Sequence, residues 1–210
     1  YKTTVSRNDG HNLLRIAKTV DGIVLPDGTR VDTASRSTVF AEMIKSLERD
    51  GPLATGVSFG AVMIVVILAT ASRRGAFAVL LALVFGVTWT LGLAAMFGMR
   101  LNFLNFIALP ITFGIGSEYP FNIYDRSRLL GGDITSAVKL HLGAVTLCSY
   151  TTVIGYGSLL FADNQALQSF GKLSIMGETA CVLAALLFLP ALLHVISPPF
   201  KQAQLKPHGS

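Results

Sequence analysis

The residues best suited to chemistry are an acid and a phenol that lie next to each other in an otherwise apolar stretch. Glu118 and Tyr119 follow residues 101–117, which contain no Asp, Glu, Lys or Arg. A carboxyl group at membrane depth is costly to ionise, so its protonated form is favoured and it can load and release a proton. A tyrosine hydroxyl can donate to or accept from such a carboxyl. The pair predicts a proton relay, unless Glu118 lies at the membrane surface with its carboxyl in cytoplasmic water.

The spacing of neighbouring residues supports this relay. Asn122 follows Glu118 by one helical turn and shares its face, so it is a possible support of the relay. A proline lacks the N–H group that would bond back into a helix, and broken helices at membrane depth are where transporters often build sites. The residues predicted to break the helix or to allow close packing there are Gly114, Gly116, Pro110 and Pro120.

A second acid and a group of hydroxyls lie in other apolar stretches. Glu178 is predicted to be a second relay group or a helix–helix hydrogen-bonding partner, and the alternative is a structural acid near the membrane surface. Ser149 and Thr152 lie within one helical turn of each other. They could face Glu118 and carry water, or they could simply serve helix packing. All three are possible supports of the relay.

The composition of the whole chain places these residues in a membrane protein. Hydrophobic residues make up 51% of the 210 residues and charged residues 14%, whereas about 25% charged is usual in soluble domains. A helix needs about 20 mostly apolar residues to cross a bilayer. The predicted spans are about 52–72, 75–98, 101–124, 140–162 and 171–196. We therefore expect an all-α polytopic bundle of five transmembrane helices in a lipid bilayer.

Neither a cofactor nor a metal is expected. The chain has no nucleotide-binding, zinc-protease or Cys-x-x-Cys motif. Cys148 and Cys181 fall in different apolar stretches without the spacing of metal ligands. The net charge is +5, but the excess basic residues flank the apolar stretches, so nucleic-acid binding is not expected.

The first 50 residues are predicted to lie outside the membrane as a small α/β module. A short strand is expected at 30–34, and an amphipathic helix at 39–47 is expected to end at Gly51 and Pro52, where proline can open the next helix. Such a module is too small to bury its own core comfortably. The predicted division is a module with its lead-in helix at 1–50, a bundle at 51–197 and a polar tail at 198–210.

Basic residues in the short loops predict the orientation. Seven Lys and Arg residues would lie on one side of the membrane, against Arg100 and Lys172 on the other. The side richer in Lys and Arg is normally cytoplasmic. We therefore expect residues 1–50 to be extracytoplasmic, the C-terminal tail to be cytoplasmic, and residues 133–139 to form a short helical segment at the cytoplasmic face.

Several segments resemble the resistance-nodulation-division (RND) superfamily, most closely its MMPL-type and hopanoid-exporter-like branch. Asn-Phe-Leu-Asn-Phe at 102–106 and Gly-Ile-Gly-Ser-Glu-Tyr at 114–119 are similar to the fourth helix of that family, where Gly-Ile-Gly-x-Asp-Tyr is typical. Glu118 replaces the usual Asp, and Pro120 follows the tyrosine. Further resemblances lie at 39–44, which is similar to the segment before the second helix, at 151–157 for the fifth helix, and at 170–171, 177–178 and 189–193 for the sixth.

The resemblance implies a fold and a function. The five spans match helices two to six of one RND half, and residues 1–50 match the end of its extracytoplasmic porter domain. The expected partners are the missing N-terminal half of the same protein, protons, and a hydrophobic or lipid-like substrate. Glu118 and Tyr119 would then form the relay of a proton-motive-force-driven exporter in the bacterial inner (cytoplasmic) membrane. The resemblance does not fix an oligomeric state.

Two other functions remain open from the sequence. The same fold could serve an uncoupled lipid-binding protein or scaffold of the sterol-sensing type, which would not depend on Glu118. An intramembrane enzyme could use Glu118 and Glu178 as acid and base, but no nucleophile or metal set accompanies them. The sequence therefore favours a transporter, not an enzyme.

Overall fold

The computed structural model describes residues 36–70, 72–99 and 103–196, and these residues are almost entirely helical. The chain divides into two compact units, Tyr1–Ala54 and Thr55–Ser210. The described residues contain no β-strand. The strand predicted at 30–34 and the tail at 198–210 lie outside the described residues, so the expected α/β module stays a prediction.

The first described element is one long helix, where the sequence predicted two. Helix α2 (Arg36–Ala69) runs through Pro52 without a break. A proline inside a helix removes one backbone hydrogen bond and crowds the preceding turn. Residues 53–69 contain no charged side chain, and this apolar segment continues as helix instead of starting a new element. The predicted boundary at Gly51 and Pro52 is therefore not a helix boundary.

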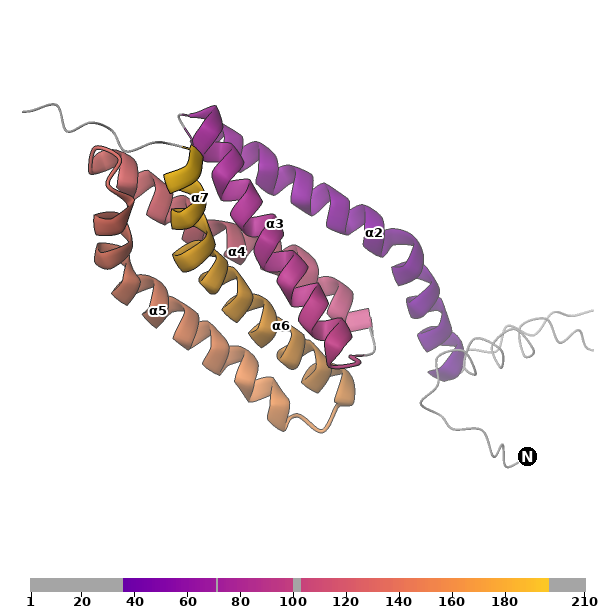
Figure 1. Cartoon of the computed structure of the whole chain (residues 1–210). Coiled ribbons are helices and arrows are strands. Elements are labelled where there is room, and N and C mark those ends of the chain that lie inside the picture. Colours follow the sequence, from indigo (N-terminus) through magenta and orange to yellow (C-terminus); the bar gives the residue numbers. More distant parts are fainter. Residues whose placement is uncertain (1–35, 71, 100–102, 197–210) are drawn as a thin grey trace, which may run out of the picture. The chain divides into compact units, whose positions relative to one another are not determined.

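The second unit is a bundle of helices joined by short turns (Figure 1). A positive-φ glycine, Gly98, follows α3, and two more, Gly131 and Gly132, separate α4 from α5. Glycine adopts this conformation without the steric cost that other residues meet. The helices after α2 are α3 (Arg73–Met96), α4 (Phe103–Leu129), α5 (Ile134–Ser158), α6 (Gln165–Leu183) and α7 (Leu189–Ile196).

Two helices differ in extent from the predicted spans. The segment predicted at 133–139 is not separate, because α5 begins at Ile134 and continues to Ser158. Asp133 caps it, since its side chain accepts a hydrogen bond of 3.1 Å from the backbone N–H of Ser136. The predicted last span contains a π turn, η2 (Ala184–Phe188), between α6 and α7.

The helices have the length and composition of membrane spans. Four segments of the described chain are long and apolar enough to cross a bilayer: Arg49–Ala69, Arg73–Met96, Ile134–Phe161 and Gln165–Ile196. Helix α4 has 27 residues but is less apolar, because it carries Glu118, two asparagines and two prolines. The prediction of an α-helical, multi-pass membrane bundle is thus confirmed, with α4 as its most polar member.

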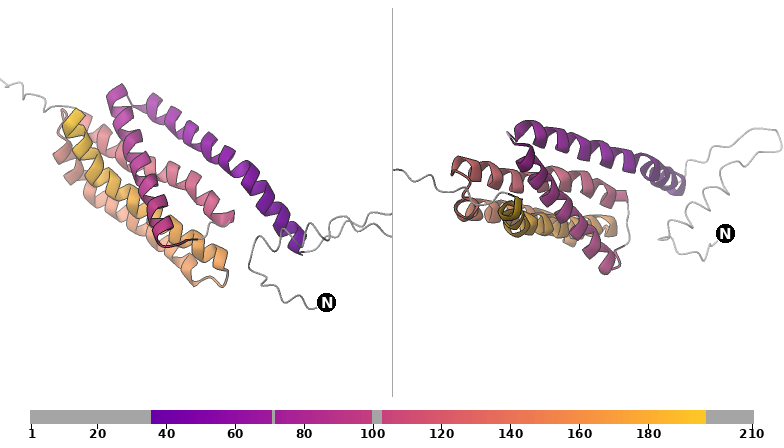
Figure 2. Two further views of the ribbon diagram at one scale, coloured as in Figure 1. Left: turned by 45° about the vertical axis from the view of Figure 1, so that its right-hand side comes forward. Right: turned by 45° about the horizontal axis from the view of Figure 1, so that its top comes forward.

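Helix α6 is central, because it packs against α3, α4 and α5 (Figure 2). Small residues allow this close approach. A methyl group added at Gly116 of α4 would lie 2.6 Å from Sγ of Cys181 on α6. One added at Gly177 of α6 would lie 3.1 Å from Oγ1 of Thr112 on α4. Glycine at these two positions therefore brings the α4 and α6 backbones together.

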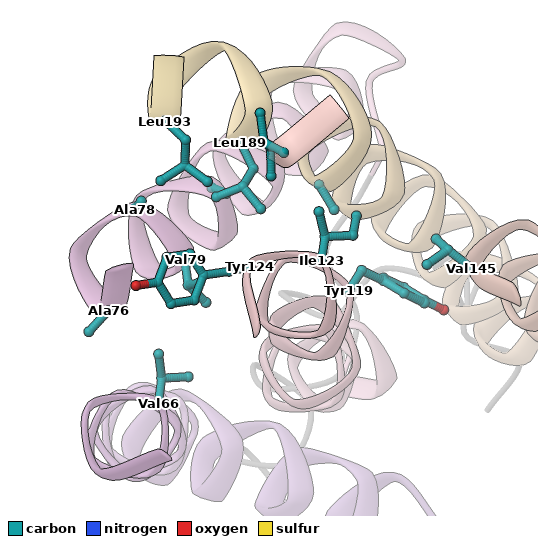
Figure 3. Packing of buried hydrophobic residues seen from close by; sticks show 13 residues of the cluster. Val66, Ala76, Ala78, Val79, Tyr119, Ile123, Tyr124, Val145, Leu189 and Leu193 are labelled. Atoms are coloured by element: carbon teal, nitrogen blue, oxygen red, sulfur yellow. The ribbon is translucent and has the colours of Figure 1, made fainter. Parts of the chain in front are cut away.

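The core and the surface of the bundle are both apolar. In the main hydrophobic cluster, Tyr119 and Tyr124 point to opposite sides of α4, and Tyr124 lies beside Ala76 and Val79 of α3 (Figure 3). Large apolar side chains also cover the outside, among them Leu68 on α2 and Leu147 on α5. Such an apolar surface is suited to contact with lipid.

Candidate functional site

A buried carboxyl and a buried phenol meet in the middle of the bundle. Tyr119 of α4 is 2% exposed and Glu178 of α6 is 5% exposed. The Tyr119 hydroxyl donates a hydrogen bond to Oε1 of Glu178. A buried acid is tolerated only when its oxygens have partners. The phenol therefore stabilises a carboxyl that the apolar bundle would otherwise disfavour.

Helix α5 completes the surroundings of this pair. Ser149 is buried and its side chain faces the Glu178 carboxyl. The sulfur of Cys148 lies 3.9 Å from the Tyr119 hydroxyl oxygen. Side chains from α4, α5 and α6 thus converge on one polar point within the apolar core.

A small cavity adjoins Glu178. Its polar lining comes from Thr112, Tyr156, Ser174 and Glu178, and its apolar lining includes Ile111 and Ile115. Ser174 precedes Glu178 by one turn on α6 and is 4% exposed. The Ser174 hydroxyl has no hydrogen-bond partner among the residues that the structure describes. The cavity therefore joins a buried carboxyl to an unsatisfied buried hydroxyl.

Glu118 lies elsewhere, on an exposed face of α4. Successive residues in a helix point about 100° apart, so the burial of Tyr119 turns its neighbour outward. The Glu118 carboxyl is still close enough to Glu178 to interact with it electrostatically. Two nearby carboxyls resist being ionised together. Glu118 lies near the Tyr119–Glu178 contact but outside the buried cluster.

The other predicted support residues are more peripheral. Thr152 donates a 3.0 Å hydrogen bond to the carbonyl of Cys148 in its own helix, and Asn122 is half-buried. The predicted site group therefore divides. The structure brings Tyr119, Ser149 and Glu178 together, and it leaves Glu118, Asn122 and Thr152 outside that cluster.

The predicted helix break in α4 does not occur. The helix is continuous from Phe103 to Leu129 with Pro110 and Pro120 inside it. One lost hydrogen bond per proline is tolerated in membrane helices when neighbouring groups compensate. Of the two glycines, Gly116 is buried at a helix contact, while a methyl group at Gly114 would meet nothing within 4 Å. Only Gly116 therefore serves packing within the bundle.

Sequence reasoning missed Thr112, Tyr156 and Ser174, which line the cavity. Glu178 follows Ser174 by four positions, which places both side chains on one face of a helix. This spacing is the feature of the sequence from which Ser174 could have been predicted. The contact from α4 to α6 also includes a 3.0 Å hydrogen bond from Asn105 to Ser169. Among residues 36–70, 72–99 and 103–196, no group of three His, Cys, Asp or Glu side chains could hold a metal ion.

The chain is similar to known transporters of one family. The MMPL family model matches residues 4–206. The hopanoid transporter HpnN of Burkholderia multivorans is 31% identical over 120 residues, which cover 57% of this chain and 13% of that protein. HpnN of Rhodopseudomonas palustris is 31% identical over 104 residues, covering 50% of this chain and 12% of that protein.

A relative from an archaeon matches over a longer stretch. The putative membrane protein MJ1562 of Methanocaldococcus jannaschii is 23% identical over 201 residues, which cover 90% of this chain and 52% of that protein. The chain thus spans about half of MJ1562 and a much smaller share of either hopanoid transporter. Together with the bundle of membrane-capable helices, these matches confirm the resemblance to the hopanoid-exporter-like branch, and the chain belongs to the MMPL family.

Proposed function

We propose that this chain is part of a proton-motive-force-driven exporter of hydrophobic or lipid-like molecules, with Glu118 and Tyr119 as the proton relay. The observation that carries the proposal is the buried contact of Tyr119 with Glu178, with Glu118 next to Tyr119 on the exposed face of α4. Proton-driven transport needs a membrane-embedded acid whose charge changes alter helix contacts. Glu178 would serve as the inner acid of the relay.

The relay would work through competition between the two acids. Because nearby carboxyls resist double ionisation, a proton that leaves one of them favours protonation of the other. Tyr119 adjoins Glu118 in the chain and hydrogen-bonds to Glu178. Its hydroxyl would reorganise as Glu178 gains or loses a proton. Because α4 and α6 also pack closely at Gly116 and Gly177, a change in the charge of Glu178 would alter how these two helices pack.

Because Glu118 is exposed on α4, we expect another part of the transporter to cover it. An acidic side chain that faced lipid at membrane depth would be costly. We propose that a second half of the transporter covers Glu118, as the RND resemblance implies. The relatives named hopanoid transporters support a hydrophobic or lipid-like substrate class for this chain. The proposed location is the inner membrane, with residues 1–50 extracytoplasmic and the tail cytoplasmic.

The test is transport by Glu118→Gln in the complete protein, reconstituted in liposomes with an imposed proton gradient. A hopanoid serves as the transported probe, and an internal pH dye reports proton entry. We expect Glu118→Gln to abolish both hopanoid export and the coupled proton flux, because glutamine cannot carry a proton. Asp163→Asn is the matched control, since Asp163 is an exposed acid in the turn before α6. Proton-coupled export by Glu118→Gln at the unsubstituted rate would refute the relay.

The alternative function, an uncoupled lipid-binding protein of the sterol-sensing type, predicts a different outcome in the same liposomes. Hopanoid binding would persist with a protonophore present and would be equal in the unsubstituted protein and in Glu118→Gln. Export that stops when the protonophore is added would reject this alternative.

A further inference from the structure

The cavity beside Glu178 has the size and polarity of a site for one water molecule. It has room for about one water molecule. Buried waters typically make two to four hydrogen bonds to polar groups that lack other partners. Ser174 supplies such a group, because its hydroxyl is buried and has no partner within the described part of the chain.

The other polar groups of the cavity are placed to complete the coordination. Glu178 uses one oxygen, Oε1, to accept from Tyr119, and a carboxyl has further lone pairs for a water. Thr112 donates its hydroxyl proton to the carbonyl of Ala108 at 2.8 Å, which leaves its oxygen free to accept. Ser174, Thr112 and Glu178 thus offer one donor and several acceptors around a single position.

We propose that this cavity binds one water molecule, held by the Ser174 hydroxyl and the Glu178 carboxyl, and that Glu178 exchanges its proton through this water. In the exchange, protonated Glu178 gives its proton to the water while the water returns one of its own protons to the other carboxyl oxygen, so atoms and charge balance. The Ser174 hydroxyl donates a hydrogen bond that holds the water in place and gives up no proton. The proposal deepens the proposed function by giving Glu178 an access route separate from Tyr119.

The ionisable groups near Glu178 come from α4, α5 and α6. Helix α4 contributes Tyr119 and Glu118, and α5 contributes Tyr156 and Cys148, while Cys181 lies on α6 itself. Helix α3 has ionisable side chains only at its first two residues, Arg73 and Arg74. Tyr119 is not among the described residues that line the cavity. Among the described residues that line the cavity, Thr112 and Ser174 contribute the aliphatic hydroxyls.

The first test is structural. The complete protein, solved at a resolution that shows ordered water, should have a water within hydrogen-bonding distance of Oγ of Ser174 and of a Glu178 carboxyl oxygen. A cavity that is dry or closed by a neighbouring side chain would overturn the proposal.

The second test is kinetic and uses infrared spectroscopy of the protein in bilayers. On transfer from H2O to D2O, the carbonyl band of protonated Glu178 shifts, and Glu178→Gln identifies that band by removing it. Ser174→Ala should slow this exchange by about tenfold, the effect of losing one hydrogen bond to the water in the transfer path. Thr179→Ala is the matched control, because Thr179 is exposed on the same helix and bonds to the Ile175 carbonyl. Exchange in Ser174→Ala at the unsubstituted rate would overturn the proposal.

These outcomes separate the water route from the transport function. If Glu118→Gln abolishes export while Ser174→Ala exchanges normally, the relay stands and the water route fails. If Ser174→Ala slows the exchange but Glu118→Gln exports normally, the water site stands and the proposed function fails. Thermal unfolding of each variant verifies that it is folded.

Discussion

Tyr119 and its neighbour Glu118 lie in very different surroundings although they are adjacent in the chain. Glu118 lies on the exposed surface of the bundle, whereas Tyr119 is buried against Glu178. The sequence marks both residues as unusual, because they interrupt an apolar span. It could not show which of them turns inward, since that depends on how α4 is rotated against α5 and α6. The assignment of Glu178 to the inner position therefore needed the structure.

Tyr119→Phe tests the buried contact at the scale of one residue. The change removes the donor to Glu178 and keeps the ring, so we expect a loss of about 1 kcal/mol in stability, typical of interhelical hydrogen bonds in membrane proteins. Thermal unfolding in detergent, followed by circular dichroism, measures it. Tyr150→Phe is the control, because Tyr150 is 62% exposed on α5. Equal stability of the two variants would contradict the importance of the contact.

Close helix packing accounts for Gly116 of α4 and Gly177 of α6. The prediction that Gly114 and Gly116 allow packing could be read from their small size, but only the helix contacts distinguish them. A methyl group at Gly116 would lie 2.6 Å from Cys181, while one at Gly114 would meet nothing within 4 Å. The sequence also gave no sign that α4 would remain continuous through two prolines.

The paired substitutions Gly116→Ala and Gly114→Ala test this packing. Gly116→Ala should cost about 1–3 kcal/mol, the usual penalty for extra volume in a packed core. Gly114→Ala should be neutral or slightly stabilising, because alanine favours helix more than glycine does. The midpoint of thermal unfolding in detergent measures both. If Gly114→Ala proved the more damaging, the contact between α4 and α6 would not be as described.

The start of α5 adds a pH-dependent prediction at the scale of an element. Hydrogen bonds from the Ser136 hydroxyl and backbone hold the pKa of Asp133 below its ordinary 3.8. A lowered pKa means that the charged cap stabilises the folded state above pH 3.8, and that this contribution is lost as the pH falls through the lowered value. Asp133→Ala should therefore lower the unfolding temperature at neutral pH, and the difference should shrink in strong acid.

Asp133→Asn is the matched control for that experiment. Asparagine is also a good N-cap residue but does not titrate. Asp133→Asn should therefore be more stable than Asp133→Ala in acid as well as at neutral pH. If Asp133→Ala and the unsubstituted protein differed equally at neutral and strongly acidic pH, the carboxylate would not be the capping group.

At the scale of the whole molecule, composition predicted most of the architecture. Long charge-free stretches identified the helices of the bundle, because a bilayer requires them. Helix ends were less predictable, since α5 and α2 extend beyond their apolar stretches into polar sequence. The cavity at Glu178 was not predictable, because it forms between three helices whose relative rotation depends on the packing of the whole bundle.

The predicted orientation can be tested on the whole protein by labelling introduced cysteines. In a Cys148→Ser and Cys181→Ala background, Asp163→Cys should react with a membrane-impermeant maleimide in intact cells, because the turn before α6 is expected outside. Gly132→Cys, in the turn between α4 and α5, should react only after the cells are opened. Labelling of both positions in intact cells, or the reverse pattern, would contradict the orientation.

The π turn at η2 has a consequence for how the last helix presents its side chains. A π turn holds one more residue than an α turn, so everything beyond it is rotated by about 100° relative to an uninterrupted α-helix. Leu189 and Leu193 after the turn are buried, as Glu178 is before it. Forcing the same residues into α-helical geometry would turn Leu189 and Leu193 by about 100° from the faces they now occupy. The π turn thus sets which side chains of α7 face the interior of the bundle.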